Sequence, residues 1–138
     1  MVKQKYHKLK FIGEEKKKIK AFIKEGLIGL KALSYSFITK NQIESTRKVI
    51  NKYTKRNCKV WIKLNKPRPI TKKSISVRMG KGIGKLNKYI YIIKKGMVIF
   101  ELLYSTLLSR NVIKNILKVA SFKLPIMTSI YYKKLKGI

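Results

Sequence analysis

The chain has 138 residues, 45% of them hydrophobic, which suits one folded domain with a modest core and excludes wholesale disorder. Its 35 Lys and Arg residues are set against 5 acidic residues, so the formal net charge at pH 7 is +30. Such a charge destabilises a free compact monomer by self-repulsion. Binding to a polyanion, either nucleic acid or an acidic membrane surface, would relieve that repulsion.

The first part of the chain is predicted to be a basic extension, then a strand and a helix. Residues 1–25 are dominated by Lys, and an extension that orders on RNA is favoured over a solvated arm. Residues 27–33 read as a short strand. Thr39 and Gln42 have the spacing of a capping box, which predicts a helix from there to about Arg56-Asn57. Helical spacing gives it a predicted buried face of Ile43, Thr46, Ile50 and Tyr53.

The middle of the chain is predicted to be β-structure. An alternating pattern predicts one strand around Val60, Ile62 and Leu64, which Pro67 and Pro69 then interrupt. Ile75 and Val77 are interpreted as a further alternating segment. Residues 80–84 are rich in glycine and predict a loop with unusual backbone angles.

The last part of the chain is predicted to hold a hairpin, a helix and a strand. Residues 89–94 and 97–102, joined by a Lys95-Gly96 turn, are interpreted as a β-hairpin. A helix is predicted over residues 105–123, ahead of Pro125, and a final strand over residues 126–132. The predicted buried stripe of that helix is Leu108, Val112, Ile116, Val119 and Ala120.

Several classes of function are disfavoured by the composition. Five scattered Glu, no Asp and the single His7 do not readily supply an acid–base pair, a catalytic triad or a metal cage. We therefore expect a protein that is not an enzyme, with no catalytic residues, no metal, no cofactor and no small-molecule substrate. The apolar runs fall far short of the roughly 20 residues of a membrane-spanning helix. The Gly-rich stretch also departs from a phosphate-binding loop, because Leu86 follows Gly84-Lys85 in place of Ser or Thr.

Residue usage bears on where the protein is made. Cys58 is the only cysteine, so no internal disulfide forms and a reducing compartment fits. Lys far outnumbers Arg, and Ile, Asn and Tyr are abundant, which is typical of an AT-rich genome. The first thirty residues contain neither Arg nor Ser, unlike a transit peptide. We expect an organelle-encoded protein of the mitochondrial matrix, with the plastid and the bacterial cytoplasm as alternatives.

One run of residues carries a specific resemblance. Val60-Trp61-Ile62-Lys63, Pro69-Ile70-Thr71-Lys72-Lys73 and Val77-Arg78-Met79-Gly80-Lys81-Gly82 resemble, in that order, the large-subunit ribosomal protein sixteen family of bacteria and organelles. Further matches are Gly29-Leu30-Lys31-Ala32, Gln42-Ile43-Glu44 with Arg47, Gly96 with Val98 to Glu101, and Lys123-Leu124-Pro125-Ile126 with Thr128. Together they span residues 29–128.

The resemblance implies an α+β fold of the α/β-hammerhead type, with two main helices and an antiparallel or mixed sheet. The expected divisions are a basic N-terminal extension (1–25), an rRNA-binding domain (26–132) and a basic C-terminal tail (133–138). The expected partners are large-subunit rRNA, aminoacyl-site tRNA and neighbouring ribosomal proteins, with residues 78–84 pointing toward the peptidyl transferase region. The alternative is a free-standing RNA chaperone or nucleic-acid-binding protein. The candidate rRNA- or tRNA-binding residues are Lys31, Arg47, Arg56, Lys63, Arg68, Lys72, Lys73, Arg78, Met79, Gly80, Lys81, Gly82, Gly84, Lys85 and Lys123.

Overall fold

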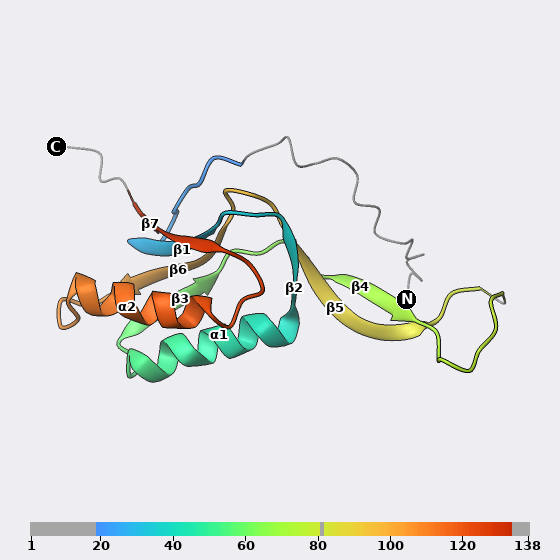
Figure 1. Ribbon diagram of the computed structural model, residues 1–138. Coiled ribbons are helices and arrows are strands. Elements are labelled where there is room, and N and C mark those ends of the chain that lie inside the picture. The colour runs from blue at the N-terminus through green and yellow to red at the C-terminus, as the bar shows by residue number, and fades with distance from the viewer. Residues whose placement is uncertain (1–18, 81, 134–138) are drawn as a thin grey trace.

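A computed structural model describes residues 19–80 and 82–133 and confirms an α+β fold (Figure 1). Two helices and seven strands form within these residues, and every strand pairing among them is antiparallel. In chain order they are β1 (Ile28–Ala32), β2 (Ser36–Thr39), α1 (Lys40–Tyr53), β3 (Cys58–Ile62), β4 (Arg68–Lys72), β5 (Lys85–Ile93), β6 (Val98–Tyr104), α2 (Arg110–Ser121) and β7 (Thr128–Tyr132).

The body of the molecule is a four-stranded sheet covered on one face by both helices. The strands lie in the order β3-β6-β1-β7, and α1 and α2 pack side by side beneath them in Figure 1. Alternate residues of the two central strands face the helices, so Ile28, Leu30, Phe100 and Leu102 are all at most 1% exposed. Burying such side chains contributes about 1.5–3 kcal/mol each, and this layer is the core.

A short segment before β1 covers the opposite face of the sheet. Residues 19–26, which include the described part of the predicted extension (19–25), run above the sheet in Figure 1. Ile23 on this segment is 2% exposed, and Leu27 N–H bonds to the Leu102 carbonyl at 2.8 Å. The segment therefore covers part of the sheet face that the helices leave open.

A second sheet has the order β2-β5-β4 and extends away from the body. Strands β4 and β5 form a long hairpin whose connecting loop lies at the far end of the molecule in Figure 1. Pro69 lies within β4, which the sequence pattern did not assign to a strand. It is tolerated there because β4 is an edge strand, and the missing N–H breaks no ladder on the outer side.

The predicted hairpin of residues 89–102 is wrong. Its turn forms, since Met97 N–H bonds to the Lys94 carbonyl at 3.1 Å. The strands on either side then diverge: β5 pairs with β2 and β4, whereas β6 pairs with β1 and β3. A turn motif between two apolar segments predicts only the turn. It does not predict which strands the two flanking segments pair with.

The helix boundaries and faces are confirmed in part. The capping box is present: Gln42 N–H donates to Thr39 Oγ1 at 3.3 Å and Thr39 N–H to Gln42 Oε1 at 2.9 Å. Helix α1 ends earlier than predicted, and Tyr53 is 55% exposed rather than buried.

Helix α2 is shorter than predicted, and its buried stripe is displaced. It begins after the Ser109 cap, and Val112 and Val119 are 45% and 43% exposed. Its buried residues are Ile113, Ile116, Leu117 and Ala120. Apolar residues occupy both faces of this helix, so periodicity alone did not identify the inner one. Ile75 and Val77 lie in the loop after β4 rather than in a strand.

Candidate nucleic-acid interface

The hairpin formed by β4 and β5 is a basic element that extends away from the body (Figure 1). We call residues 68–90 the arm and residues 73–84, at its end, the arm loop. Register runs from Arg68 opposite Ile90 to Lys72 opposite Lys85, with an irregularity between Ile70 and Thr71. Strand β5 is exposed from Lys85 to Tyr89 and becomes buried only where it meets β2. The outer half of the arm therefore has no core of its own.

The arm carries positive charge with nothing to balance it along the chain. No acidic residue occurs between Glu44 and Glu101 in the sequence. Lys72 and Lys85 are cross-strand partners, and like charges directly opposite each other destabilise a sheet. A polyanion bound along the arm would offset this repulsion, because each lysine would be attracted to the phosphates between them. The described cations of the arm are Arg68, Lys72, Lys73, Arg78, Lys85 and Lys88.

The arm loop is open to solvent, as the glycine-rich sequence predicted. Gly80 and Gly82 have φ values of +117° and +82°, which side-chain-bearing residues rarely adopt. The Lys73 ammonium donates to the Gly80 carbonyl across the loop. Ile75 and Met79 are 98% and 96% exposed, so they contribute nothing to the core. Apolar side chains held this far from the body are available to contact bases or another macromolecule.

The structure gathers most of the predicted site residues on the arm. These are Arg68, Lys72, Lys73, Arg78, Met79, Gly80, Gly82, Gly84 and Lys85. Lys81 was predicted with them and lies outside the described residues.

The remaining predicted residues lie on the body. Arg47 is on α1, paired with Glu44 at 2.6 Å, and hydrogen bonding from its guanidinium lowers the pKa of the Glu44 carboxyl. Arg56 follows α1 with φ +61°, and Lys123 follows α2 and is exposed. Lys63 follows β3 and bonds to Glu25 at 2.7 Å. Two of these four cations are already paired with carboxylates, whereas no ion pair is found on the described part of the arm.

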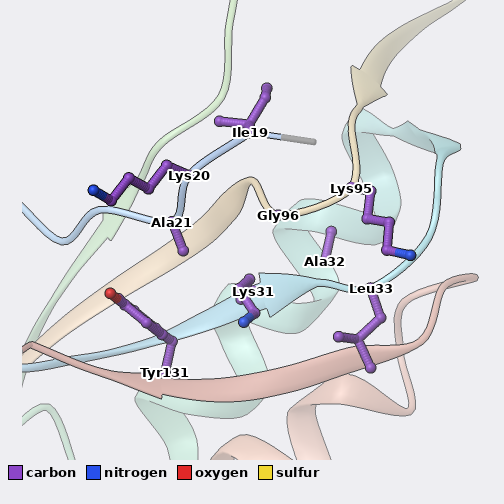
Figure 2. A pocket seen from close by; sticks show the side chains of 9 residues that line it. All are labelled: Ile19, Lys20, Ala21, Lys31, Ala32, Leu33, Lys95, Gly96 and Tyr131. Carbon is purple, nitrogen blue, oxygen red and sulfur yellow. The ribbon is translucent and has the colours of Figure 1, made fainter. Parts of the chain in front are cut away.

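Lys31 belongs to a second basic feature, a pocket on the body that the sequence pattern did not indicate. It has a volume of about 530 Å³ and lies where residues 19–21 cross the end of β1 and the turn before β6 (Figure 2). Lys20, Lys31 and Lys95 line it together with Tyr131, and the Lys31 ammonium lies 5.3 Å from the centre of the Tyr131 ring. These four residues come from four separate segments of the chain, so no contiguous sequence motif predicts the pocket.

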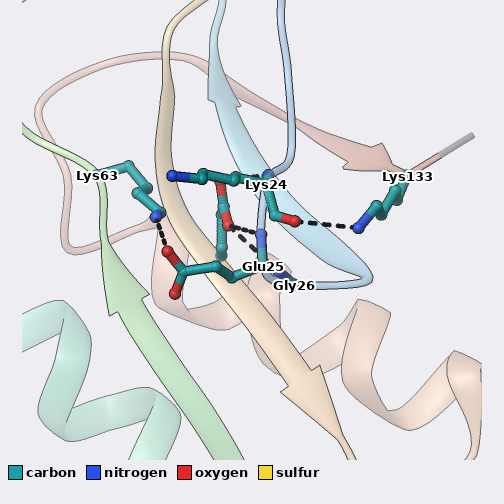
Figure 3. Close-up of polar contacts among 6 residues, drawn as sticks. Lys24, Glu25, Gly26, Lys63 and Lys133 are labelled. Carbon is teal, nitrogen blue, oxygen red and sulfur yellow. Dashed lines mark hydrogen bonds and ion pairs between the residues drawn. The ribbon is translucent and has the colours of Figure 1, made fainter.

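A buried carboxylate holds the segment that forms one wall of this pocket. Glu101 on β6 is 1% exposed and accepts the backbone N–H groups of Lys24, Glu25 and Gly26 at 3.2, 3.0 and 3.2 Å. Burial alone would raise the pKa of the Glu101 carboxyl, but these hydrogen bonds outweigh it and the pKa is lowered. Figure 3 shows the surrounding contacts, in which Lys63 bonds to Glu25 and the Lys133 ammonium to the Lys24 carbonyl.

Other kinds of site are not found in the described part of the chain. Residues 19–80 and 82–133 contain no group of three His, Cys, Asp or Glu side chains that could hold a metal ion. Cys58 is buried, and burial raises the pKa of its thiol, which disfavours the reactive thiolate. Neither described helix has the length and apolar content that crossing a bilayer requires.

Comparison with known proteins identifies relatives along almost the whole chain. The family described as ribosomal protein L16p/L10e matches residues 1–131. The large ribosomal subunit protein uL16c of Euglena longa is 37% identical over 129 residues, covering 94% of this chain and 92% of its own length. The large ribosomal subunit proteins uL16 of Staphylococcus carnosus strain TM300 and Staphylococcus aureus strain Newman are 42% and 41% identical over 107 residues. Those two alignments each cover 78% of this chain and 72% of the relative.

Proposed function

Because the chain belongs to the ribosomal protein L16p/L10e family and is a structural, non-enzymatic protein of the large ribosomal subunit, we propose that it binds large-subunit rRNA through the arm. We further propose that it supports the aminoacyl-tRNA site. The family membership favours this function over a free-standing RNA chaperone. The neighbouring proteins of the subunit are its further partners.

One observation supports the arm as the rRNA-binding element. It is a hairpin without acidic residues that projects from a folded body. Lys72 and Lys85 lie opposite each other on it, and Ile75 and Met79 in its loop are almost fully exposed. Such an element is poorly stabilised alone and gains by counterion release when phosphates surround it. Arg68 and Arg78 each offer a planar fork of donors to phosphate oxygens or a guanine edge.

The arm loop is proposed to be the part that reaches the tRNA-binding region. Residues 78–84 carry the motif by which the chain resembles its family, and positive φ at Gly80 and Gly82 allows close approach of the loop backbone to RNA. The exposed Met79 side chain supplies an apolar contact at the same place. In this proposal the body binds rRNA through its own cations and positions the arm.

Removing the arm loop tests this function directly. Purified ribosomes carrying a chain without residues 80–84, or with Arg78→Ala, are expected to accommodate aminoacyl-tRNA more slowly or to stall in late subunit assembly. The isolated variant chains are expected to keep the circular dichroism of the parent, because the loop contributes no core residue. Lys118→Ala on α2 is the matched control for loss of one exposed charge. Normal accommodation and normal assembly in both arm variants would refute the proposal.

The relatives belong to organellar-type and bacterial large subunits, and we propose that the ribosome of this chain is mitochondrial. The support is the residue usage, rich in Lys, Ile, Asn and Tyr as expected from an AT-rich organelle genome. Mass spectrometry of ribosomes from separated organelles should find the chain in the mitochondrial large subunit. Its recovery only from plastid or cytoplasmic ribosomes would contradict the assignment.

A further inference from the structure

The pocket beneath residues 19–21 combines features that a solvated basic surface lacks. Its floor is the end of β1, at Lys31 and Ala32, with Leu33 just after it, and its sides are the N-terminal segment and the Lys95-Gly96 turn. In Figure 2 the Tyr131 side chain rises from β7 toward Lys20 and Ala21, with Lys31 beside it. Three lysines therefore line a hollow that also presents an aromatic ring and aliphatic carbon, and in Figure 2 the Lys20 and Lys95 side chains extend to opposite sides of it.

The pocket is held open by backbone bonds rather than by the lysines themselves. Ile19 N–H bonds to the Lys95 carbonyl at 3.0 Å, and Gly96 N–H bonds to the Ala32 carbonyl at 2.8 Å. Gly96 has φ +90°, and a Cβ at this position would collide with the Ile19 carbonyl. Only glycine lets the N-terminal segment lie this close to the turn. Together with the Glu101 hydrogen bonds, this arrangement preforms the pocket.

The charge of the lining selects an anionic ligand. The lining residues that the structure describes include Lys20, Lys31 and Lys95 and no acidic side chain. A bare phosphate would use the lysines and leave the ring and the aliphatic floor unused. A volume of about 530 Å³ lies in the range of about 300–1,000 Å³ that small-molecule sites occupy, and exceeds what a single phosphate fills.

We propose that this pocket binds one unpaired nucleotide of an RNA chain, with its base stacked on Tyr131 beside Lys31 and the flanking phosphates of the chain held at Lys20 on one side and Lys95 on the other. Bases in a duplex remain stacked on each other, whereas unpaired bases are splayed out and stack on aromatic side chains. Lysines at the rim carry the charge, and the ring provides a face that any base can use. The inference rests on the proposed RNA-binding function and adds a contact on the body, separate from the arm.

A short single-stranded oligoribonucleotide containing 5-iodouridine tests the contact. Photocrosslinking of the full chain, followed by peptide mass spectrometry, is expected to place a crosslink on Tyr131. Affinity is measured in parallel with a single-stranded oligoribonucleotide carrying 2-aminopurine, whose fluorescence is quenched on stacking. Tyr131→Leu is expected to abolish the crosslink and to weaken binding by about tenfold, as loss of one stacked base predicts. Tyr131→Phe retains the ring and is expected to bind like the parent.

Matched variants separate the pocket from the general charge of the protein. Lys20→Gln/Lys31→Gln/Lys95→Gln and Lys52→Gln/Lys59→Gln/Lys118→Gln remove the same charge from the pocket and from exposed positions elsewhere. The pocket triple variant should lose clearly more affinity and most of the quenching. Tyr53→Leu, a change of the exposed tyrosine on α1, should alter neither readout. Circular dichroism of each variant verifies the fold.

The possible outcomes distinguish the pocket from the proposed function. If the parent chain binds RNA and Tyr131→Leu binds as tightly as Tyr53→Leu, the pocket assignment is overturned while RNA binding stands. If the parent chain does not bind RNA at all, both fail. Uridine monophosphate is expected to compete only weakly, because it lacks the neighbouring phosphates. Full displacement by stoichiometric mononucleotide would overturn the assignment to an RNA chain in favour of a free nucleotide.

Discussion

Glu101 has an unusual role for an acidic side chain in so basic a protein. It is the one buried acid among the described residues, yet its oxygens accept backbone N–H groups instead of pairing directly with a lysine. The negative charge attaches the N-terminal segment to β6 through backbone N–H groups. Because that segment also walls the pocket, one carboxylate connects the core to a candidate RNA contact.

Glu101→Gln is expected to destabilise the chain by about 2 kcal/mol at pH 7, the cost of losing hydrogen bonds to a charged group. The folded-state pKa of Glu101 is lowered, so this stabilisation is present above the ordinary carboxyl pKa of about 4.3 and is lost as pH falls through the folded-state value. The stability difference between parent and variant should therefore shrink under acid conditions. Urea unfolding across this pH range measures it.

Glu25→Gln is the matched control for that experiment. Glu25 is exposed and pairs with Lys63 at the surface, where an ion pair contributes about 0–1 kcal/mol. Equal stability losses for the two variants at pH 7 would show that the buried carboxylate has no special role.

The structural elements differ in how much of them the sequence could predict. The capping box, β1 and β7 were predicted because their signals are local: a polar pair at the right spacing, or an apolar run between breakers. The pairing of β5 with β2 was not, because β2 is only four residues long and a strand's partner is decided by tertiary packing. The same reasoning separates the two sites. The arm loop is one contiguous motif, whereas the pocket is assembled from four segments.

The two helix caps give a prediction about elements. Thr39 and Gln42 make reciprocal bonds at the start of α1, whereas Ser109 accepts a single exposed bond of 3.4 Å from Val112 N–H at the start of α2. Thr39→Ala is expected to cost about 1 kcal/mol of unfolding free energy, and Ser109→Ala less. Chemical denaturation of the two variants side by side tests the ranking. A larger loss for Ser109→Ala would contradict this account of the α1 terminus.

For the arm we predict that one substitution raises the stability of the free chain and lowers its RNA affinity. Lys85→Gln removes the repulsion with Lys72 across the hairpin, so the free chain is expected to gain a few tenths of a kcal/mol in stability. The same change should weaken RNA binding, because it removes one phosphate contact. Denaturation and RNA titration of the same preparation measure both.

Lys59→Gln on β3 is the control, since Lys59 lies opposite the uncharged Leu103. Lys59→Gln should not raise the free energy of unfolding, because it relieves no cross-strand repulsion. If Lys85→Gln lowered stability and left RNA affinity unchanged, the arm would be a structural hairpin rather than a binding element.

At the scale of the whole molecule, the two candidate contacts lie on different parts of one basic body. The arm extends from the second sheet, and the pocket lies on the face of the main sheet opposite the helices. The fold has a well-buried core between sheet and helices, but it also carries a formal net charge of +30. Self-repulsion of this size opposes compactness in isolation, and surrounding phosphates would remove it.

The salt dependence of RNA binding tests the central claim most directly. For the parent chain and a large-subunit rRNA fragment, the logarithm of affinity should fall linearly with the logarithm of salt, by about 0.7–0.9 per phosphate contacted. Lys72→Gln/Lys73→Gln/Lys85→Gln on the arm should flatten that slope by about 2–3, whereas the Lys52/Lys59/Lys118 control variant on the body should flatten it clearly less. A parent slope near zero, or equal slopes for the parent and the arm variant, would contradict an arm that binds the rRNA backbone.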